Sequence, residues 1–308
     1  MRYSQTYLDN ISSAPIHKDI CDEMTRHYIE HYGLPGAPHQ WGQWSKAAIE
    51  SYSERSLNFL GCDATCARFC IGAELPSIGG TVLISDIEAE VIKKAAVKYR
   101  EVEHIPMQGC KYDIDAVSKI LMQHNIGLVI AAAADRITGT IQPISELSKI
   151  CAQHNVPIFC DISPLIGRHR FRLDEMGIKN GFIEGRVFGA PCDLLIGEKT
   201  DFIFPLPLAA GFVRTLEWIF DEFGTKMDSI CELIDYFWEL LQMHLPDLLI
   251  LGESPRLAGM LTVAFEDVDR AAIMLALDMQ GVAIWAGNSF SEPIEQMRVM
   301  GIPDKLSE

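Results

Sequence analysis

Short apolar runs without polar alternation most constrain what this chain can fold into. They have the length of strands and the composition of a sheet that is buried on both faces; they span residues 80–84, 127–133, 156–160 and 193–197. Helical periodicity fills the stretches between them, for example 87–99 and 114–124. This alternation predicts an α/β fold with a mostly parallel central sheet, right-handed crossovers and flanking helices.

The last third of the chain has a different pattern. Residues 214–245 form one long amphipathic stretch, with a possible break near Gly224, and a small α+β pattern follows, with strands at 260–265 and 282–285 and a helix at 270–278. A chain of 308 residues that is 48% hydrophobic can bury a large core. We therefore predict a large α/β domain over 1–220, which includes the N-terminal segment, and a small α+β domain over 221–308.

Charge and hydropathy exclude several classes of partner. Acidic residues outnumber basic ones by 42 to 26, and the resulting net charge of −16 repels nucleic acids and anionic lipid surfaces. No apolar run reaches the roughly 18 residues that cross a bilayer, and the polar residues 1–5 lack a signal-peptide pattern. We expect a cytoplasmic protein that binds neither nucleic acid nor membranes.

The nine cysteines do not form a disulfide or metal-binding pattern. Their odd number and wide spacing indicate reduced thiols. Cys62, Cys66 and Cys70 are separated by three residues rather than by the two of common zinc sites, and no second ligand pair recurs elsewhere. We therefore expect no metal site.

Four sequence blocks, in order along the chain, carry a family resemblance. The first two are 7–15 and the turn at 31–42. The third combines Thr-Gly-Thr-Ile-Gln-Pro-Ile at 138–144 with Asp-Ile-Ser-Pro-Leu-Ile-Gly at 161–167, and the fourth is the glycine-bracketed loop 281–291. Together they resemble the cysteine desulfurases, which are class V aminotransferases of the fold type I superfamily dependent on pyridoxal phosphate (PLP). The chain is identified as a degenerate member, with a small domain that is shortened relative to the family.

The resemblance implies where the coenzyme and the nucleophile would lie. Lys199 matches the lysine that forms the Schiff base, and Asp161 matches the aspartate that pairs with the pyridine nitrogen. Gly72 and Ala73 fall in the loop that holds the phosphate. Phe290 stands where the family has the cysteine that accepts sulfur. Asp161 could equally cap the turn after its strand, and Lys199 could be an exposed loop lysine.

Several other positions depart from the family pattern. Pro164 replaces a glutamine, Ala89 replaces the histidine that stacks on the coenzyme, and Glu198 replaces a histidine beside the lysine. Asp-Arg-Ile at 135–137 replaces Asn-Asn-Glu. A carboxylate next to a phosphate is repulsive, and alanine can neither stack nor transfer protons. From these substitutions we expect no bound cofactor and no cysteine desulfurase activity.

Three hypotheses for function follow. The first is a binding or regulatory protein of sulfur transfer or iron–sulfur cluster assembly, which pairs with itself or with an active paralogue and docks a scaffold or sulfur-acceptor protein. The second is a PLP-dependent class V enzyme that uses Lys199 and Asp161 with altered chemistry. The third is a desulfurase in which Cys192 or Cys160 replaces the missing nucleophile.

Overall fold

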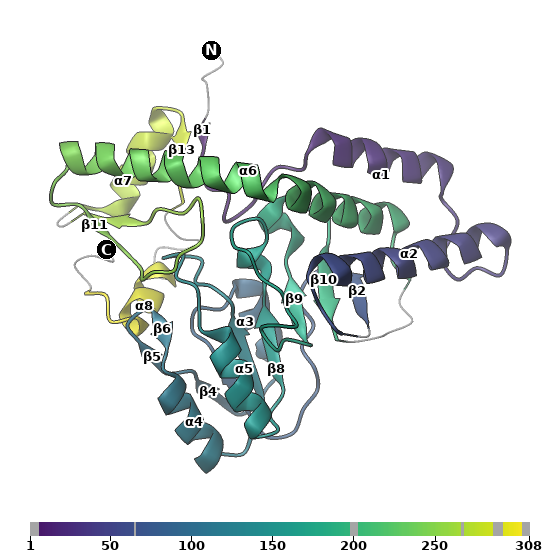
Figure 1. Ribbon diagram of the computed structural model, residues 1–308, viewed down its shortest axis with the longest axis horizontal. Helices are drawn as coiled ribbons and strands as arrows, with labels where there is room; N and C mark the ends of the chain where they lie inside the picture. The colour runs from purple at the N-terminus through teal and green to yellow at the C-terminus, as the bar shows by residue number, and fades with distance from the viewer. Residues whose placement is uncertain (1–5, 65, 198–202, 266–267, 286–291, 304–308) are drawn as a thin grey trace.

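A seven-stranded sheet forms the centre of the protein (Figure 1), of which the computed structural model describes residues 6–64, 66–197, 203–265, 268–285 and 292–303. The strand order is β2-β10-β9-β8-β7-β3-β4. Strands β4, β3, β7, β8 and β9 pair in parallel, whereas β10 is antiparallel to both of its neighbours. The bounds are β2 Ala67–Cys70, β3 Thr81–Ile84, β4 Val102–His104, β7 Ile126–Ala132, β8 Ile158–Asp161, β9 Gly181–Ile183 and β10 Asp193–Ile196.

The sheet is buried on both faces, which confirms the α/β prediction and explains why its strands lack polar alternation. Val82 and Ile84 point into a core on one face, together with Ile92 of helix α3 (Glu90–Ala96). Leu83 and Val129 point into a larger core on the other face, which helices α4 (Ile114–Gln123) and α5 (Ile144–Gln153) help to cover. Successive residues therefore serve opposite cores.

A long helix, α6 (Leu206–His244), lies across the top of the molecule in Figure 1. It packs against α1 (Lys18–Glu30) and α2 (Gln40–Phe59). It begins eight residues earlier than the amphipathic pattern predicts, because its first turns are buried almost completely and so have no polar face. It also continues through Gly224 and across residue 220, where we predicted the boundary between the two domains. The division into these two domains stays a prediction.

The C-terminal part is built from short elements, as the sequence indicates. Strand β1 (Thr6–Tyr7) pairs in parallel with β13, so the N-terminal segment is part of this region. A second small pair in this region joins β11 to β12; in the large α/β part of the chain, β5 pairs with β6 in a hairpin. The bounds are β5 Met107–Gln108, β6 Lys111–Tyr112, β11 Leu249–Ile250, β12 Val263–Ala264, α7 Arg270–Met279, β13 Val282–Ala283 and α8 Glu292–Val299. Within the described residues, every helix is too short or too polar to cross a membrane.

Helix α4 has an N-cap whose contribution can be tested. The carboxylate of Asp113 accepts a hydrogen bond of 2.9 Å from the backbone amide of Ala116. Asp113→Ala removes this acceptor, and we expect the free energy of unfolding to fall by about 1 kcal/mol in urea denaturation. Asp115→Ala is the matched control, because it removes an exposed acidic charge from the same turn without removing the cap. An equal loss in both variants would contradict a specific role for the cap.

Candidate functional site

The carboxyl ends of three adjacent parallel strands bring the charged residues of the site together. Asp161 is the last residue of β8, Glu184 directly follows β9, and Arg136 lies in the loop after β7. In open α/β sheets, ligands bind at the carboxyl ends of the strands. The side chains of Asp161 and Glu184 are almost completely buried, with exposed fractions of 0% and 7%, and that of Arg136 is 15% exposed.

Arg136 forms an ion pair with each of these two acids. Its Nη2 lies 2.8 Å from Oδ2 of Asp161, and its Nη1 lies 2.7 Å from Oε2 of Glu184. Burial lowers the pKa of Arg136, but the charges of Asp161 and Glu184 outweigh this and raise it overall. Arg186 also donates to Glu184 and to the backbone oxygen of Ser12. Two arginines and two acids therefore form one network without excess charge.

A tight hairpin holds Arg136 in this position. The carboxylate of Asp135 accepts hydrogen bonds from the backbone amides of Ile137, at 3.1 Å, and Thr138, at 2.8 Å. Gly139 has a φ of 74°, a conformation that favours glycine, and its amide donates to the carbonyl oxygen of Asp135 at 2.9 Å. The loop backbone is thus fixed on both sides of Arg136, which places the start of its side chain close to the end of β8.

The second oxygen of Asp161 is satisfied from its own strand end. Oδ1 accepts hydrogen bonds from the backbone amide of Ser163, at 3.0 Å, and from the Ser163 hydroxyl. The same hydroxyl accepts a hydrogen bond of 2.7 Å from the amide of Glu184. Ser163 therefore couples the two acids through one buried oxygen atom. Both oxygens of Asp161 have partners within the protein.

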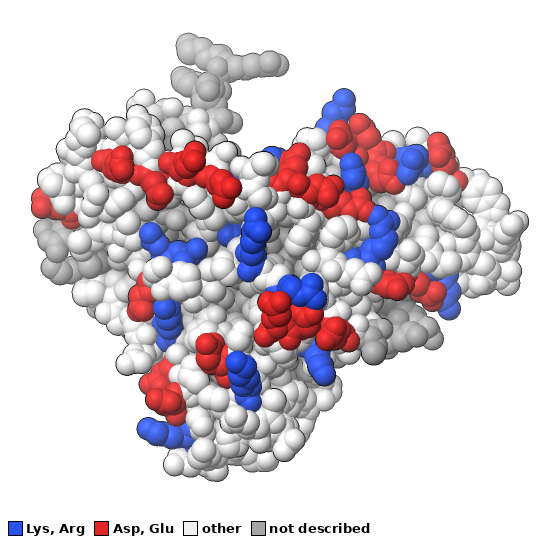
Figure 2. Space-filling view, viewed as in Figure 1, with Lys and Arg blue, Asp and Glu red and all other residues white. Residues whose placement is uncertain are grey.

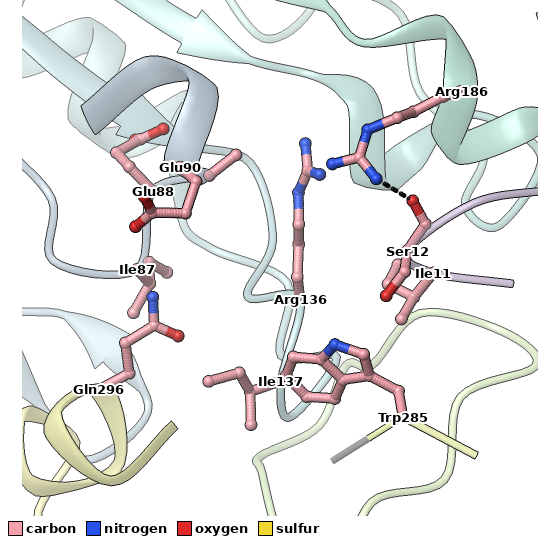
Figure 3. Close-up of a pocket in the computed structure, with 11 residues that line it drawn as sticks. Ile11, Ser12, Ile87, Glu88, Glu90, Arg136, Ile137, Arg186, Trp285 and Gln296 are labelled. Carbon is pink, nitrogen blue, oxygen red and sulfur yellow. Dashed lines mark hydrogen bonds between the residues drawn. The ribbon is translucent and has the colours of Figure 1, made fainter. Parts of the chain in front are cut away.

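A small hollow of about 50 Å³ lies beside this network. Figure 3 shows Arg136 in its centre, with Glu88 and Glu90 on one side, Arg186 and Ser12 on the other, and Trp285 below. The remaining lining residues are Ile11, Ile87, Ala89, Ile137 and Gln296. Arg136 lines the hollow and also donates to Asp161, which does not line it, so Arg136 connects the hollow to the aspartate.

Glu88 is the most unusual acid of the site, because it is buried and forms no ion pair with any residue that the structure describes. Its exposed fraction is 1%, and neither carboxyl oxygen has a hydrogen-bond partner of good geometry among the described residues. Burial raises the pKa of Glu88 well above its usual range, and the charge of Asp161 adds to the effect. Arg136, Lys93 and the nearby amide of Ala132 oppose it only in part. Glu88 is therefore protonated over a wider pH range than an ordinary glutamate.

The loop expected to hold a phosphate already uses one of its amides. The backbone amide of Gly72 donates a hydrogen bond of 2.7 Å to the Asp193 carboxylate, which also accepts one of 2.8 Å from Gly185. No helix lies between β2 and β3, a stretch that is described throughout, and Ala73 lies in this irregular segment. Lys199 and Phe290 are outside the described residues, so their expected roles stay predictions.

The two cysteines considered as alternative nucleophiles are both buried. Cys160 is 0% and Cys192 is 5% exposed. Burial raises the pKa of both thiols well above the usual range, with nearby acids adding to the effect. A thiol must be deprotonated and accessible to attack a substrate, so neither geometry favours a nucleophile. Among the described residues, no group of three or more His, Cys, Asp or Glu side chains could hold a metal ion.

Solved structures define the class of fold to which this arrangement belongs. A NifS-like protein from Rickettsia africae superposes with a TM-score of 0.84 and 17% identity, over 98% of this chain and 91% of that one. A structure described as SspA in complex with cysteine superposes with a TM-score of 0.73 and 15% identity, over 98% of this chain and 96% of that one. The fold is therefore that of the NifS-like, fold type I proteins.

The sequence comparison then gives the family. The model of the aminotransferase class-V family matches residues 6–180, and the chain belongs to that family. It is 24% identical over 345 residues to the cysteine desulfurase IscS of Dictyoglomus turgidum, covering 98% of this chain and 87% of the relative. It is 22% identical over 347 residues to the mitosomal cysteine desulfurase of Encephalitozoon cuniculi, covering 98% and 80%. The chain is a cysteine desulfurase-like member of the class V family.

Family membership corrects one expectation drawn from the sequence. We expected no cofactor from the substitutions, and this is wrong, because the cysteine desulfurases and class V aminotransferases that the chain matches are PLP-dependent. The substitutions remove individual contacts, but Asp161 is retained at the end of a buried strand. Substitutions at single positions of the site were therefore a poorer guide to the cofactor than similarity over the whole sequence.

Within the described residues, the hollow beside Arg136 is smaller than a coenzyme pocket in the present arrangement. The hollow measures about 50 Å³, whereas pockets for small ligands measure about 300–1,000 Å³. Arg136 separates the hollow from Asp161, and the amide of Gly72 is bonded to a carboxylate rather than left for a phosphate oxygen. Side chains of the site must move before the coenzyme can reach Asp161.

The sequence analysis located Arg136 only as a departure from the family and missed its partners. Glu184 and Arg186 were not recognised at all. A signal was present, because an arginine in the loop that follows a buried apolar strand is rarely left without an acidic partner. The Glu-Gly-Arg sequence at 184–186 gave no comparable indication of which acid that partner is.

Proposed function

We propose that this protein acts in sulfur transfer as a binding or regulatory subunit and does not itself form a persulfide. The observation that carries this proposal is the position of Arg136, which occupies Asp161 and closes it off from the hollow. Phe290, at the position of the family's sulfur-accepting cysteine, supports it, because a phenyl ring cannot carry sulfur. The burial of Cys160 and Cys192 supports it further.

A protein partner is part of this proposal. We propose a homodimer or a heterodimer with an active paralogue, and docking of an iron–sulfur scaffold or a sulfur-acceptor protein. Exposed aromatic and aliphatic side chains gather at the ends of α1 and α2, where Figure 2 shows a mostly uncharged area at the right of the view. Exposed apolar patches rich in aromatic residues are typical of protein interfaces. The residues are Tyr28, Ile29, Tyr32, Leu34, Trp41 and Trp44.

A second candidate function is a PLP-dependent class V enzyme with altered chemistry. It is supported by the retention of Asp161 at the end of β8 and by the family membership of the chain. In this alternative Asp161 pairs with the coenzyme and Lys199 binds it covalently. It differs from the first proposal in one measurable respect, since it requires turnover of an amino acid by this chain alone.

Two assays separate these functions. Purified protein with excess PLP is first incubated with cysteine, and we expect no sulfide above the blank without protein. It is then added to an active cysteine desulfurase at a cysteine concentration below saturation. We expect the rate of sulfide release to change by about fivefold, because coupled sites change each other's ligand affinity by about that factor or more. Sulfide release by this chain alone would overturn the proposal, as would an unchanged rate together with the absence of a complex in size-exclusion chromatography.

A surface variant is the control for the second assay. Tyr32→Ser combined with Trp41→Ser changes two exposed side chains, whose rings contact each other at a tilt with their centroids 5.4 Å apart, and leaves the buried core untouched. If the exposed ends of α1 and α2 form the docking surface, this variant stays folded but no longer changes the rate of the active enzyme. Full retention of the effect would place the contact elsewhere on the protein.

A further inference from the structure

Arg136 has the charge and the position of a competing ligand for Asp161. It is a cation whose Nη2 lies 2.8 Å from Oδ2, and the same residue lines the hollow, which Asp161 itself does not. A protonated pyridine nitrogen is also a cationic N–H donor, and it would approach Asp161 from the same hollow. Both groups cannot use the same carboxylate oxygen in this geometry, because Oδ1 is already engaged by Ser163.

The surroundings of Arg136 allow it to leave without stranding its second partner. Glu184 accepts hydrogen bonds from both Arg136 and Arg186, so it keeps a cation when Arg136 moves away. The opposite wall of the hollow carries Glu88 and Glu90, whose carboxyl oxygens could receive the displaced guanidinium (Figure 3). Glu88 has no hydrogen-bond partner of good geometry among the described residues, so it has acceptor capacity to spare.

We propose that Arg136 is an internal competitor of PLP, so that the coenzyme binds only when Arg136 releases Asp161. The proposal goes beyond the proposed function and holds whether the chain acts as a binding protein or as an enzyme. It predicts that this internal ion pair limits the affinity for the coenzyme. Only the molecules in which Arg136 has released Asp161 can bind, so the observed affinity is the intrinsic affinity multiplied by the fraction of such molecules.

The test is a titration that does not depend on catalysis. The probe is 4′-deoxypyridoxine 5′-phosphate, which has the ring nitrogen and the phosphate but no aldehyde, so it binds without reacting with a lysine. Quenching of tryptophan fluorescence reports binding, because Trp285 lines the hollow, and Trp285→Phe checks that this residue is the reporter. We expect Arg136→Met to bind the probe at least about tenfold more tightly than the unchanged protein, which corresponds to about 1.4 kcal/mol.

A double-mutant cycle identifies Asp161 as the shared partner. Asp161→Asn alone and Arg136→Met with Asp161→Asn should both lack the tenfold gain. Arg186→Met is the matched control, since it removes an arginine from the same Glu184 without touching Asp161, and we expect no gain from it. A gain that survives the loss of Asp161, or an equal gain from Arg186→Met, would overturn the proposal. So would the absence of probe binding in every variant.

A second variant keeps the proposal testable if Arg136→Met does not fold. Arg136→Lys retains a positive charge, but a single ammonium group on a shorter side chain cannot bridge both acids as a guanidinium does. We expect it to be folded and to bind the probe with an affinity between those of the unchanged protein and the methionine variant. An affinity for the probe equal to that of the unchanged protein would count against competition.

The titration is independent of the proposed function. It measures neither sulfide release nor the effect on an active desulfurase, so its failure and the failure of the proposed function are distinguishable.

Discussion

Arg136→Met is expected to lower the free energy of unfolding by about 3–5 kcal/mol, which is the cost of breaking a buried ion pair from one side. The variant leaves Asp161, which is 0% exposed, without a cationic partner at Oδ2. Glu184 keeps Arg186, so Asp161 accounts for most of the loss. Urea denaturation followed by circular dichroism at neutral pH measures the change.

The control for this prediction is an arginine pair at the surface. Arg172 forms an ion pair with Asp174, and its side chain is 54% exposed. Exposed pairs gain little because water already solvates both charges, so Arg172→Met should leave the unfolding midpoint unchanged. If both variants unfold at the same urea concentration, the buried network does not contribute more than a surface pair.

The loss caused by Arg136→Met should also depend on pH. Burial alone would raise the pKa of Glu184, but the charges and hydrogen bonds of Arg136 and Arg186 lower it below the ordinary value. A carboxyl whose pKa is lower in the folded state stabilises the protein above its unfolded pKa, and this stability is lost as the pH falls through the folded pKa. The part of the difference in stability that comes from Glu184 should therefore shrink in acid. A constant difference down to the lowest pH at which both remain folded would contradict the role of Glu184.

The sheet could be predicted from the sequence because burial on both faces leaves a local mark. The apolar runs at 80–84, 127–133 and 156–160 correspond to β3, β7 and β8 within a few residues. The run at 193–197 is β10, but its antiparallel direction left no such mark, because strand direction is set by partners distant in sequence. Strand β2, at the edge of the sheet, was missed because it is only four residues long and Arg68 interrupts its apolar run.

The site was less predictable because its contacts join distant parts of the chain. Asp161 was located through the family resemblance, and the structure places it at the end of a buried strand, as expected. Arg136, which binds Asp161, is 25 residues away from it in the sequence. Arg136 also binds Glu184, which is 48 residues away from the arginine. A sequence pattern reports which residues are charged but not which strand ends are neighbours. The order β9-β8-β7 supplies this missing information.

Glu88→Gln is expected to stabilise the protein at neutral and alkaline pH. Burial raises the pKa of Glu88 well above its usual range, so the folded state holds a proton that the unfolded state releases above about pH 4.3. Where the folded state binds more protons, stability falls as the pH rises. This loss continues until the pH reaches the folded pKa. Glutamine has nearly the same shape and does not ionise, so the variant avoids the loss.

The size of this gain is bounded by the ordinary pKa of glutamate. Keeping such a carboxyl protonated at pH 7 costs up to about 3–4 kcal/mol, which is the largest difference expected between the variant and the unchanged protein at that pH. Below the ordinary pKa both states are protonated and the difference should vanish. Urea denaturation at a series of pH values from 4 to 8 measures the whole profile.

The neighbouring acid supplies the control that separates burial from charge. Glu90 also lines the hollow, but its side chain is 43% exposed and lies 4.0 Å from Lys94, so water and a cation already solvate it. Glu90→Gln should therefore give no gain that grows with pH. If Glu88→Gln gives none either, Glu88 is ionised in the folded protein at neutral pH. Among the described residues, Arg136 and Lys93 are the cations whose charges lower its pKa, and that result would mean that they outweigh burial.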